Sequence, residues 1–170
     1  DYNGKTVWIT GASSGIGEAL ALAFVAHGAT VIASARSLDK LEDVRAKAAD
    51  PARFHPVELD MGWGEKIAEV ATEVLRRFPR IDILVNNAGI SQRSLALDTP
   101  VENYRLLMEV DYFGPVILTK AVLPHMIGQG GGHLLCTSSI VGVFGFTLRS
   151  AYSAAQHAMH GLFESVRAEY

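Results

Sequence analysis

The stretch Thr10-Gly-Ala-Ser-Ser-Gly-Ile-Gly17 decides the fold of this 170-residue chain. It lies between the β-prone run Thr6–Thr10 and a pattern of apolar residues at helical spacing. Glycines let the backbone turn tightly and approach a pyrophosphate, whose charge is attracted by the N–H groups at a helix N-terminus. Because glycines also mark ordinary turns, the motif gains its weight from its place between a strand and a helix. The residues expected to bind a dinucleotide here are Gly11, Ser13, Ser14, Gly15, Ile16 and Gly17.

Strand and helix patterns alternate along the rest of the chain. The expected strands are Thr6–Thr10, Thr30–Ala35, Phe54–Leu59, Ile81–Val85 and His133–Thr137. The expected helices after the glycine-rich turn are Leu38–Ala49, an amphipathic helix from Ile67 to Phe78, Val101–Met126 and Tyr152–Tyr170. Pro56 inside the third strand favours a place at the sheet edge. The alternation predicts a single α/β domain over residues 1–170, a doubly wound Rossmann-type parallel sheet of order 3-2-1-4-5 with ligands at the carboxyl ends of its strands.

Composition restricts the possible partners and the compartment. The net charge is -3 and the pI about 6.1, which gives no electrostatic case for nucleic acid or an anionic membrane. The apolar runs are too short to span a bilayer, and the residues that follow Asp1 are not expected to form a signal peptide. Cys136 is the single cysteine and is expected to be a small buried apolar residue, so a reducing cytoplasm fits best. The histidines form no cluster with acids or cysteine, and no metal site is expected; His157 and His160 are interpreted as a surface pair.

Three motifs in order resemble the short-chain dehydrogenase/reductase family: Thr10–Gly17, Asn86-Asn-Ala-Gly89, and Ser139 with Tyr152 thirteen residues later. The resemblance runs from Lys5 to Tyr170, and Met108–Pro115 with Arg149–Ala155 is most similar to the carbonyl- and steroid-reductase branch. It implies that Ser139 hydrogen-bonds a substrate carbonyl or alcohol oxygen and that Tyr152 is the general acid/base. It also implies a homodimer or homotetramer for the full-length protein.

The same resemblance assigns the cofactor. An acid at the end of the second strand accepts from the ribose 2′-OH of NAD, whereas a base there pairs with the 2′-phosphate of NADP. Here the strand ends Ala33-Ser-Ala-Arg36, which favours NADP(H) while NAD(H) stays possible; the alternative for Arg36 is a solvated surface arginine. The other family positions expected to line the cofactor are Asp60, Met61, Asn87, Ala88, Gly89, Tyr152 and Gln156.

Two positions depart from the family pattern. Gln156 stands where the family has a lysine four residues after the tyrosine, and Asp111 stands where it usually has an asparagine. An ammonium favours a neighbouring phenolate, while a carboxylate opposes it, so both departures work against proton transfer by Tyr152. Pro115 has no N–H, so the carbonyl of residue 111 is expected to lack its helical partner and to be able to bind a water of a proton relay.

The expected activity is NADP(H)-dependent hydride transfer to a small or medium apolar carbonyl, or from the matching alcohol. The rival is a catalytically impaired NADP(H)-binding sensor or scaffold, and turnover alongside NADPH binding separates the two. The family continues beyond its last helix with further strands, so the chain is expected to be incomplete at its C-terminus.

Overall fold

The computed structural model describes residues 1–170, which build a parallel five-stranded sheet. Its order is β3-β2-β1-β4-β5, which confirms the expected doubly wound fold. Pro56 lies in the outermost strand β3, where a missing N–H is tolerated, as the sequence predicts. The strands are β1 (Thr6–Thr10), β2 (Thr30–Ala35), β3 (Phe54–Glu58), β4 (Ile83–Asn86) and β5 (His133–Cys136).

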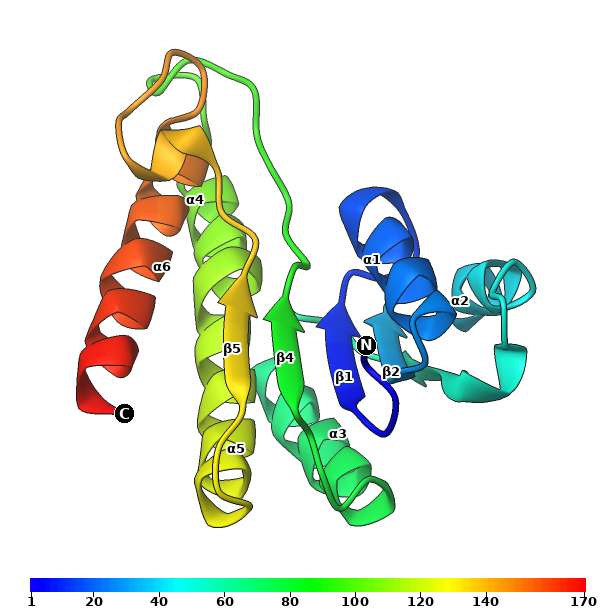
Figure 1. Ribbon diagram of the computed structural model, residues 1–170. Coiled ribbons are helices and arrows are strands. Elements are labelled where there is room, and N and C mark those ends of the chain that lie inside the picture. Colours follow the sequence, from blue (N-terminus) through cyan, green and yellow to red (C-terminus); the bar gives the residue numbers. More distant parts are fainter.

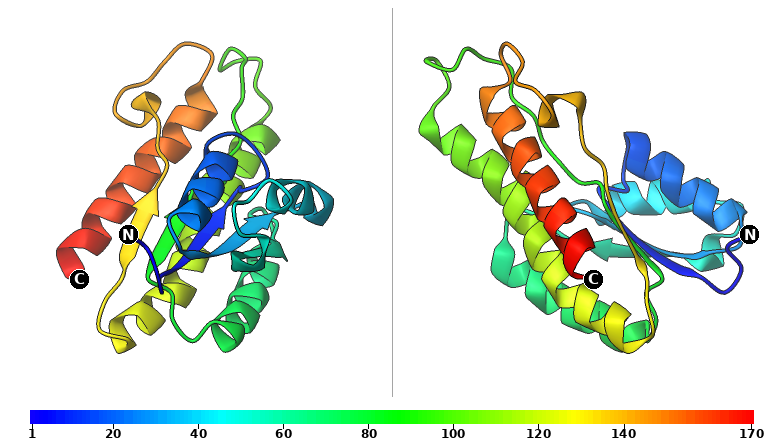
Figure 2. Two further views of the ribbon diagram at one scale, coloured as in Figure 1. Left: turned by 45° about the vertical axis from the view of Figure 1, so that its right-hand side comes forward. Right: turned by 60° about the vertical axis from the view of Figure 1, so that its left-hand side comes forward.

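Helices cover both faces of this sheet (Figures 1 and 2). They are α1 (Gly15–Ala26), α2 (Leu38–Arg45), α3 (Gly64–Arg77), α4 (Val101–Met108), α5 (Gly114–Gly128) and α6 (Ser150–Glu169). The pair α1 and α2 covers one face, and α3, α5 and α6 lie on the other (Figure 2). Alternate residues of β1 serve the two sides: Val7 and Ile9 belong to one buried cluster and Trp8 to the other. A strand buried on both faces is apolar throughout, which explains the uninterrupted apolar runs in the sequence.

The expected single helix Val101–Met126 is interrupted in the structure. Residues Glu109–Phe113 form a π-turn between α4 and α5, and the Gly114 N–H bonds to the Glu109 carbonyl. Pro115 follows directly and has no N–H to offer the preceding turn, which disfavours regular α-helical bonding there. The π-turn places Asp111 in the one irregular turn of this long element.

Several element ends also differ from the expected ones. Helix α2 ends at Arg45 rather than Ala49, because the Lys47 N–H bonds to Val44 in a tighter turn. Helix α6 begins at Ser150, two residues before Tyr152. Strand ends differ by one or two residues, at Leu59, Ile81, Asn86 and Thr137.

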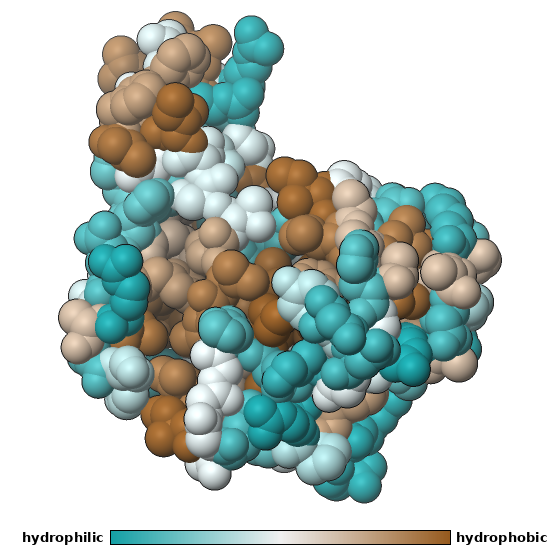
Figure 3. Space-filling model, viewed as in Figure 1, coloured by the Kyte–Doolittle hydropathy of each residue, from teal (hydrophilic) through white to brown (hydrophobic).

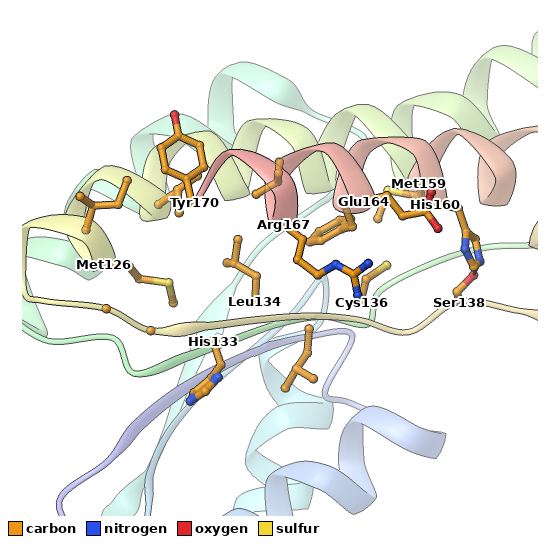
Figure 4. A pocket seen from close by; sticks show the side chains of 17 residues that line it. Met126, His133, Leu134, Cys136, Ser138, Met159, His160, Glu164, Arg167 and Tyr170 are labelled. Carbon is orange, nitrogen blue, oxygen red and sulfur yellow. Dashed lines mark hydrogen bonds between the residues drawn. The ribbon is translucent and has the colours of Figure 1, made fainter.

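In Figure 1, α6 lies beyond β5, the last strand of the sheet. Side chains of α5, β5 and α6 line a groove of about 620 Å³ beside this strand (Figure 4). Cys136 lines the groove and is half-buried rather than buried as expected. Burial still raises the pKa of its thiol to about 11, since a thiolate is poorly solvated there. No helix combines the length and apolarity needed to cross a bilayer.

Candidate functional site

The glycine-rich turn is held against the segment that follows β4. Gly11 has a φ of +68°, and a Cβ there would lie 2.8 Å from the Ala88 Cα. A Cβ on Gly17 would collide with the Gly11 carbonyl oxygen and reach 2.6 Å from Asn87 Nδ2. Both positions therefore require glycine for close backbone approach.

Hydrogen bonds fix the carboxyl ends of three strands to one another. Thr10 Oγ1 accepts from the backbone N–H groups of Asn87 and Ala88, at 3.0 Å each. Asn87 Nδ2 donates to the Thr10 carbonyl at 3.0 Å, and its Oδ1 accepts from Thr137 Oγ1 at 3.0 Å. The asparagine side chain thus joins β1, β4 and the end of β5, and its own polar atoms are used structurally.

A hollow of about 860 Å³ opens above this edge of the sheet. Among the residues expected at the cofactor, its lining contains Gly11, Ser13, Ser14, Ile16, Arg36, Asp60, Met61, Asn87, Ala88 and Gly89. Gly15 and Gly17 do not line it: Gly15 begins α1 and Gly17 is buried beneath the turn. Asp60 is the only acid in the lining, and its Oδ1 accepts from the Gly62 N–H at 2.9 Å. The hollow also contains residues that sequence reasoning missed, among them Ser37, Lys40, Trp63, Ile90 and Thr137.

Two cations at one end of the hollow have no counterion. Arg36 and Lys40 are exposed, and neither side chain takes part in a salt bridge or a side-chain hydrogen bond. Ser37 lies between them as the N-cap of α2 and accepts from the Lys40 N–H at 3.4 Å. Free cations beside a helix N-terminus fit a phosphate group. The sequence does contain a signal for Lys40: a serine at an expected helix N-cap, Ser37, is followed three residues later by a lysine. This signal could have predicted that Lys40 lies beside Arg36.

Tyr152 and Ser139 meet in a second hollow of about 380 Å³. Ser139 follows β5 and starts a 3₁₀ turn, in which its Oγ accepts from the Val141 N–H at 3.4 Å. Ile140, Val141 and Phe146 contribute apolar side chains to the same hollow. The fold therefore brings together the two residues that the sequence pairs for carbonyl chemistry.

Tyr152 also lines a third hollow of about 210 Å³, together with Gln156. This hollow and the large one share the segment Asn87–Ile90 and Thr137. Tyr152 and Ser91 are the residues that line both smaller hollows. Tyr152 thus stands between the apolar hollow of Ser139 and a small hollow that adjoins the large one.

The start of α6 is fixed by contacts that the sequence did not reveal. Tyr104 of α4 and Ser150 share a hydrogen bond of 2.6 Å between their hydroxyls. Arg149 Nη1 donates to Ser91 Oγ at 2.6 Å and to the Gln92 carbonyl at 2.8 Å, and Gln92 Oε1 accepts from the Tyr152 N–H at 3.4 Å. These bonds set the position of the helix turn that carries Tyr152.

Asp111 is turned toward the loop after β4. It is 2% exposed, and its Oδ1 accepts from the Ile90 N–H at 2.8 Å, while Oδ2 has no partner. Burial raises the pKa of this carboxyl to about 6, against the opposing effect of the Ile90 bond. The carboxyl therefore releases its proton at a higher pH than an ordinary aspartate does.

Gln156 is buried, with 5% of its surface exposed. Its Oε1 accepts from Ser138 Oγ at 3.2 Å, and Ser138 Oγ lies 2.7 Å from His160 Nε2. His157 instead bonds to the Ser153 carbonyl at 2.8 Å. The two histidines are thus not a pair, and His160 belongs to the surroundings of the site. No group of three His, Cys, Asp or Glu side chains is arranged to hold a metal ion.

The fold and these hollows define a nucleotide-binding protein of the Rossmann class. A family model described as short chain dehydrogenase matches residues 5–170. The chain belongs to the short-chain dehydrogenase family, as its motifs predict.

Curated relatives and solved structures agree with this assignment. The chain is 42% identical over 170 residues to human "Dehydrogenase/reductase SDR family member 7", covering 96% of this chain and 50% of that protein. It is 45% identical over 172 residues to a Drosophila melanogaster "SDR family protein 7-like" dehydrogenase/reductase, covering 98% of this chain and 52% of that protein. The chain thus spans about half the length of both relatives.

A crystal structure of a short-chain dehydrogenase from Streptomyces avermitilis superposes with a TM-score of 0.93 at 44% identity, covering 97% of this chain and 60% of that one. A metagenomic short-chain oxidoreductase in complex with NADP gives 0.92 at 31% identity, covering 99% and 77%.

Proposed function

We propose that this chain forms the nucleotide-binding and proton-transfer part of an NADP(H)-dependent oxidoreductase acting on a small or medium apolar carbonyl or alcohol. The observation that carries the proposal is the position of Tyr152 between the apolar hollow of Ser139 and the hollow it shares with Gln156. When bound, the nicotinamide supplies or accepts hydride. The chain then has to bind the dinucleotide, orient the substrate oxygen and move one proton.

The lining of the large hollow fits a dinucleotide phosphate. Gly11 and Gly17 allow close backbone approach, and Arg36 and Lys40 supply unpaired positive charge. NADP(H) is therefore favoured over NAD(H). The complex of the metagenomic relative with NADP supports the same choice.

The roles of the two site residues follow from their chemistry. Ser139 can hold the substrate oxygen by a hydrogen bond, while the Tyr152 hydroxyl gives a proton to the developing alkoxide or takes one from an alcohol. Ile140, Val141 and Phe146 favour an apolar substituent beside that oxygen.

Turnover of NADPH with a panel of apolar ketones and aldehydes tests the proposal, with Tyr152→Phe as the variant. We expect the parent to oxidise NADPH and the variant to bind NADPH without oxidising it. Equal turnover by both proteins would exclude Tyr152 as the acid/base.

The uncharged Gln156 favours a second candidate, an NADP(H)-binding sensor or scaffold without turnover. A parent protein that binds NADPH but does not oxidise it with any carbonyl of the panel would support this candidate.

We also propose a cytoplasmic homodimer or homotetramer. The single thiol fits a reducing compartment. Exposed apolar side chains at Val101, Phe113 and Ile127 on and between α4 and α5 suit pairing between subunits. Sedimentation of the full-length protein at micromolar concentration tests the assembly, and a clean monomer would refute it.

A further inference from the structure

A chain of three side chains connects the groove beside β5 to the hollow that contains Tyr152. Ser138 is at its centre, with its Oγ 2.7 Å from His160 Nε2 and 3.2 Å from Gln156 Oε1. Figure 4 shows the His160 ring on α6 directed at Ser138, just beyond β5. Gly142 leaves room for this contact, since a Cβ there would lie 2.8 Å from His160 Cδ2 and 3.1 Å from Ser138 Oγ.

The directions of the two hydrogen bonds that Ser138 forms depend on which atoms carry protons. A serine hydroxyl carries one proton and can donate to only one of its two neighbours. If it donates to Gln156 Oε1, His160 Nε2 must carry a proton and donate to Ser138. The amide NH₂ of Gln156 then has no protein acceptor and is left for the hollow that it lines with Tyr152.

When both hydrogen bonds run in the opposite direction, the other end of the Gln156 amide faces the hollow that contains Tyr152. A deprotonated His160 Nε2 accepts the serine proton, the Gln156 NH₂ donates to Ser138, and the amide oxygen is left for the hollow. An amide donor favours a neighbouring phenolate or ribose hydroxyl oxygen, whereas an amide oxygen disfavours a phenolate. An imidazolium can only donate, so it permits only the first of these two arrangements.

We propose that His160, acting through Ser138, is a positioning residue that sets which end of the Gln156 amide faces Tyr152. The role of that amide in the reaction rests on the proposed oxidoreductase function. In its protonated form, His160 directs the amide NH₂ into the hollow and so provides, without a charge on residue 156, a donor at this position.

No other titratable side chain near the groove bonds to His160, so its hydrogen bond to Ser138 involves only His160, Ser138 and Gln156. The other titratable groups bordering the groove are His133 and Cys136 on the β5 side and Glu164, Arg167 and Tyr170 on α6. None of them forms a hydrogen bond or a salt bridge with His160. The same holds for the titratable side chains of α4 and of the π-turn Glu109–Phe113, which also pack against α6, and the 3₁₀ turn Ile140–Gly142 carries no titratable side chain. His157, three residues earlier on α6, bonds only to backbone and is the matched control.

The direct test is a proton and nitrogen NMR titration of the chain without cofactor, from about pH 5 to about pH 8, the range in which histidines titrate. The sequence has three glutamines, Gln92, Gln129 and Gln156, so the Gln156 amide signals can be assigned by their loss in Gln156→Glu. We expect these signals to shift with the same midpoint as the His160 ring. Ser138→Ala should abolish the shift, Ser138→Thr should keep it, and His157→Asn should leave it unchanged.

A Gln156 amide that does not follow the His160 titration in the parent would overturn the proposal, with no variant needed. A shift of equal size in Ser138→Ala would overturn it as well.

Kinetics separate this inference from the proposed activity. With a reducible carbonyl, His160→Phe should lower kcat about fivefold, the effect of one lost hydrogen bond, and remove a limb of the pH profile that His157→Asn retains. An NMR coupling without turnover by the full-length protein would refute the oxidoreductase function and leave the positioning contact supported. Turnover without the NMR coupling would support the oxidoreductase function and refute the positioning role of His160.

Discussion

Asp111 Oδ1 accepts a hydrogen bond of 2.8 Å from the Ile90 N–H, which joins the π-turn between α4 and α5 to the loop leaving β4. The same carboxyl is buried and its second oxygen has no partner. The π-turn therefore holds a group whose charge is poorly tolerated, next to residues that line the Tyr152 hollows.

Asp111→Asn should stabilise the fold at alkaline pH and not at acidic pH. The folded pKa of about 6 lies above the usual value of 3.8, so the folded state binds the proton more tightly and stability falls as pH rises through this window. A shift of about two pKa units corresponds to at most about 3 kcal/mol of free energy of unfolding. Asp111→Asn should gain this stability above the folded pKa and gain none of it below the unfolded pKa. Urea unfolding at both ends of the window measures it.

Asp98→Asn is the control for that experiment, because Asp98 is an exposed carboxyl without an ionic partner. It should change stability little at either pH. A gain for Asp111→Asn that is equal at acidic and alkaline pH would show that ionisation is not its cause.

Arg36→Asp should weaken NADPH binding about 10- to 100-fold, the effect of losing a charge-assisted hydrogen bond, and leave or improve NADH binding. Lys40→Met should also weaken NADPH binding, but by a smaller factor, because the guanidinium of Arg36 matches phosphate geometry better than the ammonium of Lys40 does. Titrations followed by Trp63 fluorescence give both dissociation constants, since Trp63 lines the hollow. Arg93→Asp, with the same charge change outside the hollow, should bind NADPH like the parent.

Gly17→Ala should destabilise the chain by about 1–3 kcal/mol and weaken NADPH binding, because the new methyl group meets the Gly11 carbonyl and Asn87 Nδ2. Thermal unfolding and an NADPH titration measure the two effects. Gly161→Ala is the matched control: its Cβ meets nothing within 4 Å on an exposed turn of α6, so it should be neutral or stabilise by up to about 1 kcal/mol. Similar losses in both variants would contradict the packing argument.

In the full-length protein, Gln156→Lys should raise alcohol oxidation near neutral pH at least about tenfold and move the lower limb of the pH–rate profile toward neutrality, because an ammonium stabilises a neighbouring phenolate. Asp111→Asn should add a smaller gain. Tyr152→Phe should abolish both gains. A Gln156→Lys variant with an unchanged rate and profile, beside an inactive Tyr152→Phe, would show that charge at residue 156 does not limit the reaction.

The sequence by itself determined the sheet and its order, and the resemblance of its motifs to the short-chain dehydrogenase/reductase family paired Ser139 with Tyr152. Alternating apolar strands and amphipathic helices admit few arrangements, and glycine between the first strand and the first helix marks the nucleotide edge. These signals are local in sequence, and parallel connectivity converts them into a site at the carboxyl ends of the strands.

Only the tertiary structure decided which side chains surround that site. Trp63 joins Arg36 in one hollow although no spacing rule relates the two residues. Likewise, His160 reaches Ser138 across 22 residues, and Asp111 reaches Ile90 across 21, because α6 and the π-turn pack against the loops after β4 and β5. Such contacts depend on how elements pack and on which backbone groups are left unpaired, neither of which a periodic pattern records.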